Sequence, residues 1–135
     1  MKASEVMVAD PHVAVAGAMA SEVAIMLKTR NISVVPVVDD HRTRRFLGTL
    51  SDRDLVTRCL AEGKHPWHTR ADSLMRRESA VVRPDQELND YELRMDDEPN
   101  ESHLRATITV VDNAGRVVGF ISHPEQIPDL KIVRG

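Results

Sequence analysis

The sequence predicts an α+β fold made of two copies of a strand-helix-strand-strand-helix unit. Three pairs of short segments predict the repeat, because they recur in the same order at offsets of 68, 73 and 71 residues. Self-similarity at a nearly fixed period indicates that one supersecondary unit is built twice. Each copy of about 60 residues buries too little surface to be stable alone, so we expect the two copies to pack together. The pairs are Val6-Met7 with Leu74-Met75, Pro36-Val-Val-Asp39 with Thr109-Val-Val-Asp112, and Leu47-Gly-Thr-Leu-Ser51 with Val118-Gly-Phe-Ile-Ser122.

The first copy, residues 1–63, is predicted to contain a short extended segment at 13–15 and then a helix over 17–30. Apolar side chains recur at helical spacing along this helix and define one buried face. Asn31 follows and can end the helix in a left-handed conformation. The side chains of the buried face are Met19, Val23, Met26 and Leu27.

Two strands and a second helix complete the first copy. The β-branched run 32–38 predicts a buried strand, and residues 46–50 predict the strand after the turn. Ser51 is a good N-cap for the second helix, and Asp54 has the spacing of its capping-box partner. Gly63 is expected to terminate this helix. Its predicted buried face consists of Leu55, Val56, Cys59 and Leu60.

The second copy, residues 71–128, follows a connector at 64–70 and precedes a tail at 129–135 that we expect to be loose. Trp67 in the connector is expected to anchor packing between repeats or between subunits. The elements of the second copy repeat those of the first, with a weaker first helix that Pro99 should end or kink.

Four segments carry the prediction for the second copy. Its first helix is predicted from Leu88, Tyr91 and Met95, and its last two strands from residues 107–111 and 117–121. A short final helix is expected after Ser122, because proline is tolerated in a first helical turn.

Composition and charge exclude several classes of protein. The chain has 18 basic and 21 acidic side chains, and its net charge of -3 is too mild for a protein that binds nucleic acid. No stretch approaches the roughly 20 apolar residues of a membrane span, and the first residues do not resemble a signal peptide. Cys59 is the single cysteine, which excludes an internal disulfide and predicts a reducing, cytoplasmic setting. Residues 1–70 carry a net charge of +2 and residues 71–135 carry -5, so a polyanionic ligand should prefer the first half.

Two motifs, each recurring in the second copy, carry a resemblance to a known family. In the first copy they read Val34-Val35-Pro36-Val37-Val38-Asp39 and Gly48-Thr49-Leu50-Ser51-Asp52-Arg53-Asp54-Leu55. Together with the opening Ala3-Ser-Glu-Val-Met7, this pattern resembles the CBS domain pair, or Bateman module. The resemblance covers about residues 3–127, and the chain is similar to small bacterial proteins that consist of CBS domains alone.

The resemblance implies two βαββα repeats packed through their sheets with pseudo-twofold symmetry. It also implies clefts between the repeats for an adenosine-containing ligand such as AMP, ADP, ATP or S-adenosylmethionine. In the family, the Ser/Thr and the Asp of the second motif contact phosphate and ribose, which assigns these roles to Ser51 and Asp54. Arg53 lies between them and can meet a phosphate. The strand residues that would border the base are Ile32, Ser33 and Val34.

The second copy departs from this pattern. Thr109 replaces the proline of the first motif, Glu125 replaces the aspartate after Ser122, and Pro124 takes the place of the arginine. Ser122 and Glu125 remain candidate ligand contacts. An acidic stretch at 96–101 would repel phosphate if it lined this cleft, so we expect the second site to bind a nucleotide less well than the first.

The leading hypothesis is a non-catalytic regulatory module that binds an adenosine-containing ligand and acts on a partner that the sequence does not identify. The alternative is a degenerate pair that serves as a protein-interaction module without a nucleotide. An enzyme is the weakest interpretation, because no nucleophile–base pair, metal set or glycine-rich phosphate loop can be assembled, and no cofactor is required. We also expect a homodimer, since two repeats leave apolar helical faces without a third layer to cover them.

The simpler interpretation of Ser51 and Asp54 is a capping box with no ligand role. If both roles are present, the substitutions should separate them. Ser51→Ala removes the primary cap, whereas Asp54→Ala removes only its secondary partner, so Ser51→Ala is expected to lose more stability.

Overall fold

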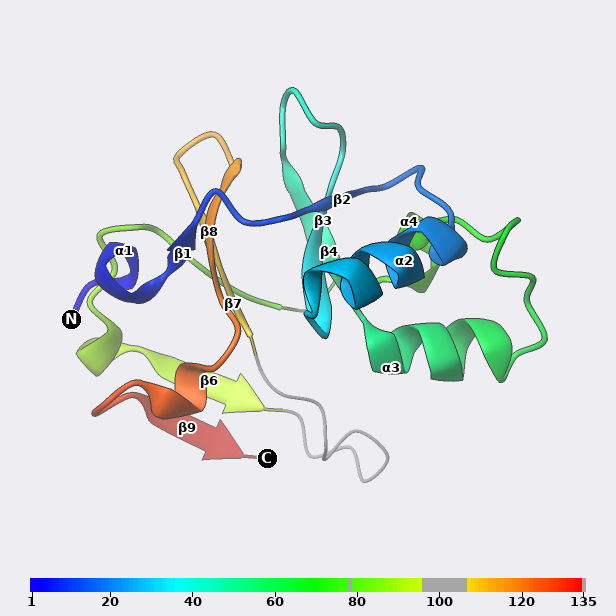
Figure 1. The fold of residues 1–135 in the computed structure, drawn as a ribbon. Coiled ribbons are helices and arrows are strands. Elements are labelled where there is room, and N and C mark those ends of the chain that lie inside the picture. The colour runs from blue at the N-terminus through cyan, green and yellow to red at the C-terminus, as the bar shows by residue number, and fades with distance from the viewer. Residues whose placement is uncertain (78, 96–106, 135) are drawn as a thin grey trace. The chain divides into compact units, whose positions relative to one another are not determined.

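The computed structural model describes residues 1–77, 79–95 and 107–134, and the chain divides into two compact units (Figure 1). The central unit is His12–Glu78, and the terminal unit combines Met1–Pro11 with Ser79–Gly135. This division differs from the boundaries of the sequence repeats. The first eleven residues pack with the second copy, and the connector 64–70 packs with the first.

The central unit confirms the predicted order of strand, helix, strand, strand and helix. Strand β2 is parallel to β3, and β3 is antiparallel to β4, which gives a sheet of order β2-β3-β4. The elements are β2 (Ala14–Val15), α2 (Ala20–Arg30), β3 (Val34–Val38), β4 (Phe46–Ser51), α3 (Asp52–Asp54), the π-helix η1 (Leu55–Leu60) and α4 (Ala71–Leu74).

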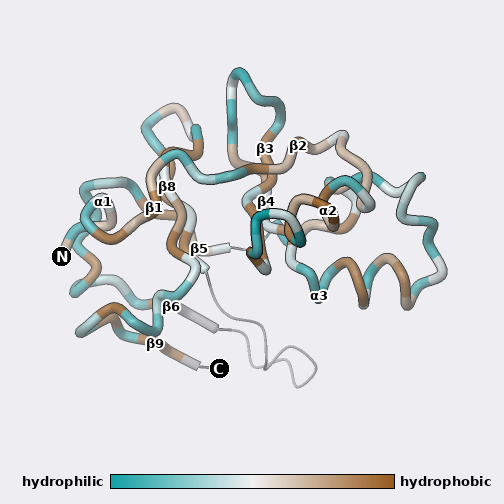
Figure 2. The backbone as a smooth tube through the Cα atoms, in the orientation of Figure 1, coloured by the Kyte–Doolittle hydropathy of each residue, from teal (hydrophilic) through white to brown (hydrophobic). Residues whose placement is uncertain are grey.

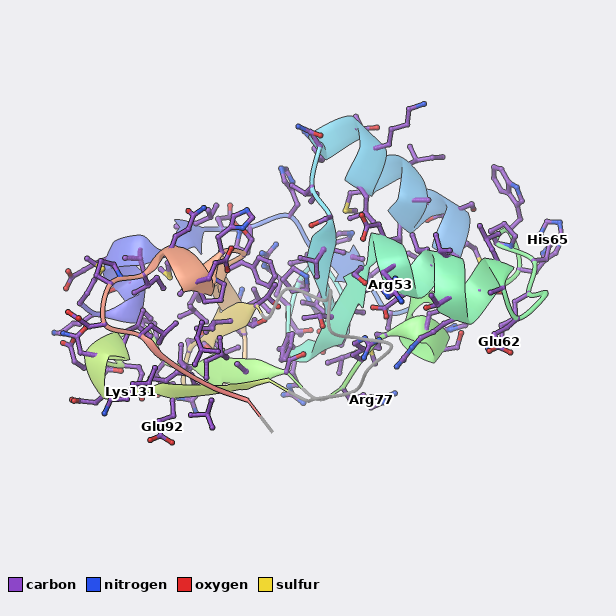
Figure 3. The ribbon with its side chains drawn as sticks, turned by 90° about the horizontal axis from the view of Figure 1, so that it is seen from below. Arg53, Glu62, His65, Arg77, Glu92 and Lys131 are labelled. Carbon is purple, nitrogen blue, oxygen red and sulfur yellow. The ribbon has the colours of Figure 1, made fainter. Side chains whose placement is uncertain are left out.

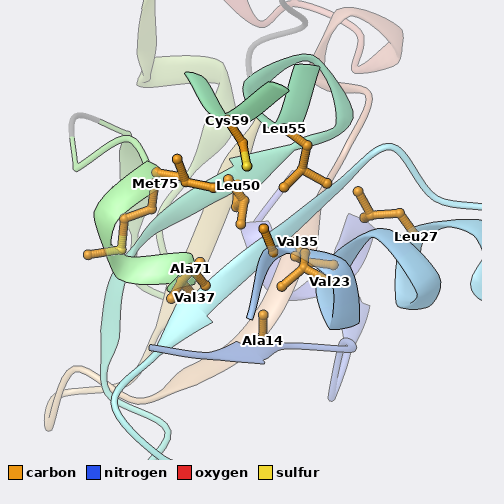
Figure 4. Close-up of a cluster of buried hydrophobic side chains, with 12 residues drawn as sticks. Ala14, Val23, Leu27, Val35, Val37, Leu50, Leu55, Cys59, Ala71 and Met75 are labelled. Atoms are coloured by element: carbon orange, nitrogen blue, oxygen red, sulfur yellow. The ribbon is translucent and has the colours of Figure 1, made fainter. Parts of the chain in front are cut away.

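Helix α2 covers the core of the central unit. It begins at Ala20, three residues later than predicted, and ends at Asn31, whose φ of 54° is the expected left-handed conformation. Val23 and Leu27 point into a cluster of buried side chains that the three strands and the other helices complete (Figure 4). Met26 is only partly buried at the edge of this cluster.

The helix after β4 buries a narrower face than the sequence predicts. Leu55 and Cys59 are buried, but Val56 is 55% exposed and Leu60 is 59% exposed. Both exposed positions directly follow the buried ones and lie on the adjoining stripe of the helix, so only one stripe reaches the core. Figure 2 shows hydrophobic bands along the coiled part of the backbone tube that follows β4.

The terminal unit is built on a four-stranded sheet of order β1-β8-β7-β5. Strands β1 and β7 are antiparallel to β8, and β5 is parallel to β7. A second, two-stranded sheet pairs β6 with β9 in parallel. The elements are α1 (Ala3–Val6), β1 (Val8–Ala9), β5 (Ala80–Val82), the 3-10 helix η2 (Leu88–Asp90), β6 (Glu92–Met95), β7 (Ile108–Val111), β8 (Val117–Ile121), the 3-10 helix η3 (Pro124–Gln126) and β9 (Lys131–Arg134).

Two predictions for the second copy are wrong. Only Leu88–Asp90 is helical where a longer helix was expected, and Glu92–Met95 forms strand β6 instead. The tail expected to be loose contributes Lys131–Arg134 as strand β9, with Glu92 in register with Lys131 (Figure 3). Both differences from the prediction have the same physical cause. The two segments pair with each other, and the hydrogen bonds between their backbones replace those that a helix would supply. Leu93 on β6 is 1% exposed, so this strand covers the core of the terminal unit.

The recurring Val6-Met7 and Leu74-Met75 segments play equivalent roles in the two units. Each segment ends a short helix that begins at a fully buried alanine, Ala3 or Ala71, and in each the methionine N–H donates to the carbonyl of that alanine over 3.0 Å. Met7 lies against Gly119 of β8 and Met75 lies against Gly48 of β4. Each sheet is therefore packed against a helical turn that lies at the start of the other copy in the sequence.

Candidate functional site

The candidate site lies where β4 ends and α3 begins, at the second motif of the first copy. Ser51 is the N-cap of α3, and its Oγ accepts a hydrogen bond from the Asp54 N–H over 3.1 Å. The Oδ2 atom of Asp54 accepts in return from the Ser51 N–H over 3.0 Å. The capping box predicted from the sequence is confirmed, and it fixes both side chains at this junction.

Asp54 has two further partners that the sequence analysis missed. Its Oδ1 accepts a hydrogen bond of 2.9 Å from Nε of Arg76, and Nε of Arg58 lies 3.7 Å from the same oxygen. The Asp54 side chain is 2% exposed, whereas those of Arg76 and Arg58 are 21% and 41% exposed. One buried carboxylate therefore lies against two guanidinium groups that still reach solvent.

Backbone hydrogen bonds hold residue 76 beside strand β4, and they thereby fix the point from which the Arg76 side chain extends. Thr49 and Arg76 exchange two backbone hydrogen bonds, of 2.9 and 2.8 Å, which join the segment after α4 to strand β4. Gly48 permits this approach, because a Cβ at that position would collide with the carbonyl oxygen of Arg76. The motif glycine thus positions an arginine beside the motif aspartate.

The contact between Arg58 and Asp54 could have been predicted from the sequence, whereas the contact between Arg76 and Asp54 could not. Arg58 stands four residues after Asp54, a spacing that places the two side chains on one face of a helix. Its Nη1 also donates to the Leu74 carbonyl over 3.3 Å. Arg76 lies 22 residues from Asp54, and only the tertiary contact with β4 brings the two together.

The remaining first-copy candidates gather at the same end of the sheet. Val34 is opposite Ser51 in the register of β3 and β4, and the Ser33 carbonyl accepts from the Asp52 N–H over 2.9 Å. Ile32 is partly buried against the core. Arg53 projects from α3 beside this junction (Figure 3).

The second-copy candidates form a different arrangement. Ser122 is not a helix cap, because η3 begins at Pro124 with His123 as the N-cap residue and without a side-chain cap. Glu125 is exposed, and its Oε1 lies 3.2 Å from Nδ1 of His123. The acidic stretch 96–101, expected to repel phosphate, lies outside the described residues. The two copies therefore differ at the position where the first has its capping box.

Charge separates the two units more strongly than it separates the two halves of the sequence. The central unit has 11 basic and 8 acidic side chains, a net charge of +3, and the terminal unit has 7 basic and 13 acidic side chains, a net charge of -6. The difference comes from residues 1–11, which carry one basic and two acidic side chains and belong to the terminal unit, whereas residues 71–78 add two basic and two acidic side chains to the central unit. The candidate site thus lies in the basic unit.

Neighbouring acids of the central unit have partners of their own. Arg70 donates two hydrogen bonds, of 3.1 and 3.0 Å, to Asp72, and they hold the pKa of that carboxyl below its usual value. In the turn between β3 and β4, the Thr43 hydroxyl donates to Asp39 over 2.6 Å and lowers the pKa of Asp39.

The described residues contain neither a metal-binding cluster nor a membrane-spanning helix. Over residues 1–77, 79–95 and 107–134, no three His, Cys, Asp or Glu side chains are grouped so that they could hold a metal ion. In the same part of the chain, none of the helices has the length and apolar character needed to cross a membrane.

Comparison with known families and curated proteins gave one match. The family model of the CBS domain matches residues 3–61, which include the candidate site. No curated protein matches the sequence significantly.

Solved structures share the fold over most of the chain. Hypoxic Response Protein I, solved with two coordinated zinc ions, is 22% identical, with a TM-score of 0.71 over 90% of this chain and 92% of that chain. The CBS domain pair of MJ0100, in complex with 5-methylthioadenosine and S-adenosylmethionine, is 22% identical, with a TM-score of 0.67 over 90% and 92% of the two chains. The CBS domain protein TA0289 from Thermoplasma acidophilum is 21% identical, with a TM-score of 0.69 over 90% and 65% of the two chains.

Proposed function

Since this chain carries a CBS domain and has the fold of a CBS domain pair, we propose that it is a non-catalytic regulatory module for an adenosine-containing ligand. AMP, ADP, ATP and S-adenosylmethionine are the ligands to test. The observation that carries the proposal is the junction of β4 and α3, where the motif residues Ser51 and Asp54 are held in a defined geometry.

The chemistry of this junction suits a nucleotide. The Ser51 hydroxyl can donate to a phosphate oxygen while it accepts from the backbone, and the Asp54 carboxylate is an acceptor for ribose hydroxyls. The net charge of +3 on the central unit favours an anionic ligand at this site. A neighbour in the fold comparison, MJ0100, was solved with adenosine-containing ligands, which supports this class.

One observation favours the alternative function, a protein-interaction module without a nucleotide. The Asp54 carboxylate already accepts from Ser51 and Arg76 and is nearly inaccessible to solvent. A ligand can use this group only by replacing an existing partner. Binding measurements on the free protein separate the two functions.

Isothermal titration calorimetry with AMP, ATP and S-adenosylmethionine tests the proposal, and Ser51→Ala and Ser122→Ala form a matched pair of variants. Losing the Ser51 contact should weaken binding by about tenfold, the effect of about 1.4 kcal/mol. Ser122→Ala changes the equivalent serine of the second copy and should leave the first site unaffected. Absence of heat with every ligand would support the interaction module instead.

We further propose that the module is a homodimer. Helix α2 and η1 pack against each other, and both carry large apolar side chains that the chain itself leaves exposed. Ile25 is 57% exposed, Val56 55% and Leu60 59%, and Trp67 in the following connector is 61% exposed. Burial of these side chains in a second copy would remove apolar surface from water.

A further inference from the structure

The Met7 side chain joins the first strand of the terminal unit to the core of that unit. Strand β1 is short, and the side chains of both its residues, Val8 and Ala9, are exposed. Its pairing with β8 comprises two register positions, the second of which places Ala9 opposite Gly119 (Figure 1). Met7 directly precedes the strand and packs against the buried cluster of the terminal unit. The strand therefore depends on Met7 for its apolar contact.

The sulfur of Met7 occupies the space that a side chain at position 119 would need. A Cβ at Gly119 would collide with the Met7 side chain, so the thioether lies directly on the backbone of β8. Met7 is also only half-buried, which leaves it within reach of a small solute. A thioether is a soft group that suits such an apolar contact. Its sulfoxide has a polar S–O bond, which is costly at the edge of an apolar core.

Met75 is the equivalent residue of the central unit and differs in two respects. It is 6% exposed, and it is a member of the buried cluster rather than a residue at the edge of one. Its segment also has an anchor that does not involve the side chain, the two backbone hydrogen bonds exchanged by Thr49 and Arg76. The fold therefore protects one methionine of the pair and leaves the other accessible.

We propose that Met7 is an oxidation site and that a peroxide acting on it releases β1 from β8. Hydrogen peroxide transfers one oxygen atom to Sδ: its O–O bond breaks, an S–O bond forms, and water leaves. The sulfur loses two electrons and the peroxide gains them. The more polar side chain then leaves the edge of the core, and β1 loses its apolar contact. Methionine sulfoxide reductases restore the thioether with electrons from a thiol, so the release is reversible.

Treatment of the full chain with hydrogen peroxide, followed over time by peptide mass spectrometry, tests the site. Met7 should be converted to its sulfoxide at least tenfold faster than Met75. The oxidised protein should unfold at a temperature lower by about 4 °C, because a partly buried apolar contact is lost. Amide exchange at residues 8–10 should become at least tenfold faster, because these residues belong to the released segment. Incubation with methionine sulfoxide reductases and dithiothreitol should restore both values.

Met7→Leu is the matched control, because leucine fills a similar volume and has no sulfur. Peroxide should leave the unfolding temperature of this variant unchanged, although Cys59 and the other methionines remain in it. Met75→Leu makes the equivalent change in the central unit and should keep the full sensitivity of the wild type. Each variant is compared before and after treatment, so a change in its basal stability does not affect the result.

Three results would overturn the proposal. Equal rates of oxidation at Met7 and Met75 would mean that the fold does not select the site. Complete oxidation of Met7 with unchanged unfolding temperature and amide exchange would mean that this side chain does not hold β1. A loss of stability in peroxide-treated Met7→Leu as large as in the wild type would assign the effect to another residue.

Discussion

At Asp54 a single carboxylate caps a helix and forms ion pairs with two arginines. Its two oxygens accept from the Ser51 N–H and from Arg76, and Arg58 lies within ion-pairing distance. Removing the side chain breaks all of these interactions at a position that is 1% exposed. Removing the Ser51 hydroxyl breaks only the bond to the Asp54 N–H.

We therefore predict that Asp54→Ala destabilises the protein more than Ser51→Ala, the reverse of the order expected from the sequence. Loss of the charge-assisted bonds of Asp54 should lower the free energy of unfolding by about 1.5–3 kcal/mol. Loss of the Ser51 cap should lower it by about 1 kcal/mol. Urea unfolding of both variants measures the order, and a larger loss for Ser51→Ala would mean that the arginine contacts add nothing.

The turn between β3 and β4 predicts a local response to pH. Asp39 accepts from the Thr43 hydroxyl and from the Arg45 N–H over 2.8 Å, and the hydroxyl is the main reason that its pKa is lowered. A lowered pKa means that the ionised form stabilises the turn. This contribution is complete above the ordinary aspartate pKa of about 3.9 and is lost as the pH falls through the lowered value.

An NMR titration of the Asp39 carboxyl carbon should accordingly show a midpoint below that ordinary value. Thr43→Val removes the hydroxyl at nearly constant volume and should move the midpoint up toward it. The protection of the Arg45 amide, measured against the unfolded exchange rate at the same pH, should fall over the pH range in which Asp39 is protonated. An unchanged midpoint in Thr43→Val would show that the hydroxyl is not the cause.

At the scale of elements, the two glycines that face the short helices differ in what they contact. A Cβ at Gly48 would meet the Arg76 carbonyl, which is backbone, whereas a Cβ at Gly119 would meet the side chain of Met7. A methionine side chain can change rotamer, but a strand-paired carbonyl cannot move without losing its hydrogen bond to Thr49.

Gly48→Ala is therefore expected to destabilise the fold by about 1–3 kcal/mol or more, the usual cost of overpacking. Gly119→Ala should cost clearly less. Thermal unfolding of the two variants compares them directly, and equal losses would mean that the approach of residue 76 to β4 is not constrained by the glycine.

The elements that the sequence predicted correctly are those that local residues determine. The left-handed Asn31 and the capping box of Ser51 and Asp54 depend on neighbours within a few residues. Strand β6 was missed because its partner β9 comes 39 residues later in the sequence. The local sequence shows only the helical spacing of Leu88 and its neighbours and does not reveal this strand pairing. Arg76 was missed for the same reason, since a backbone bridge to Thr49 brings it to the site.

At the scale of the whole molecule, light scattering tests the proposed homodimer. We expect a mass of about twice the chain mass of 15.1 kDa at micromolar concentration. Leu60→Asp places a charge among the exposed apolar side chains of α2 and η1 and should shift the protein to a monomer. Val81→Asp is the control, because Val81 is 41% exposed but belongs to the terminal unit. A wild-type monomer would refute the proposal.

The differences between the second copy and the first predict how many nucleotides each chain binds. Its serine does not cap a helix, its Glu125 is exposed, and its unit carries a net charge of -6. Nucleotide titration should therefore give one strong site per chain. Two equal and independent sites would show that the capping box is not needed for binding.

The inclusion of Met1–Pro11 in the terminal unit has a consequence for biosynthesis. The central unit is contiguous, so all of its chain is available once Glu78 has left the ribosome. Strand β1 pairs with β8, which is translated more than a hundred residues later, on the order of 5–20 s at usual elongation rates. Strand β1 therefore leaves the ribosome long before its partner β8, and the terminal unit is completed after the central unit.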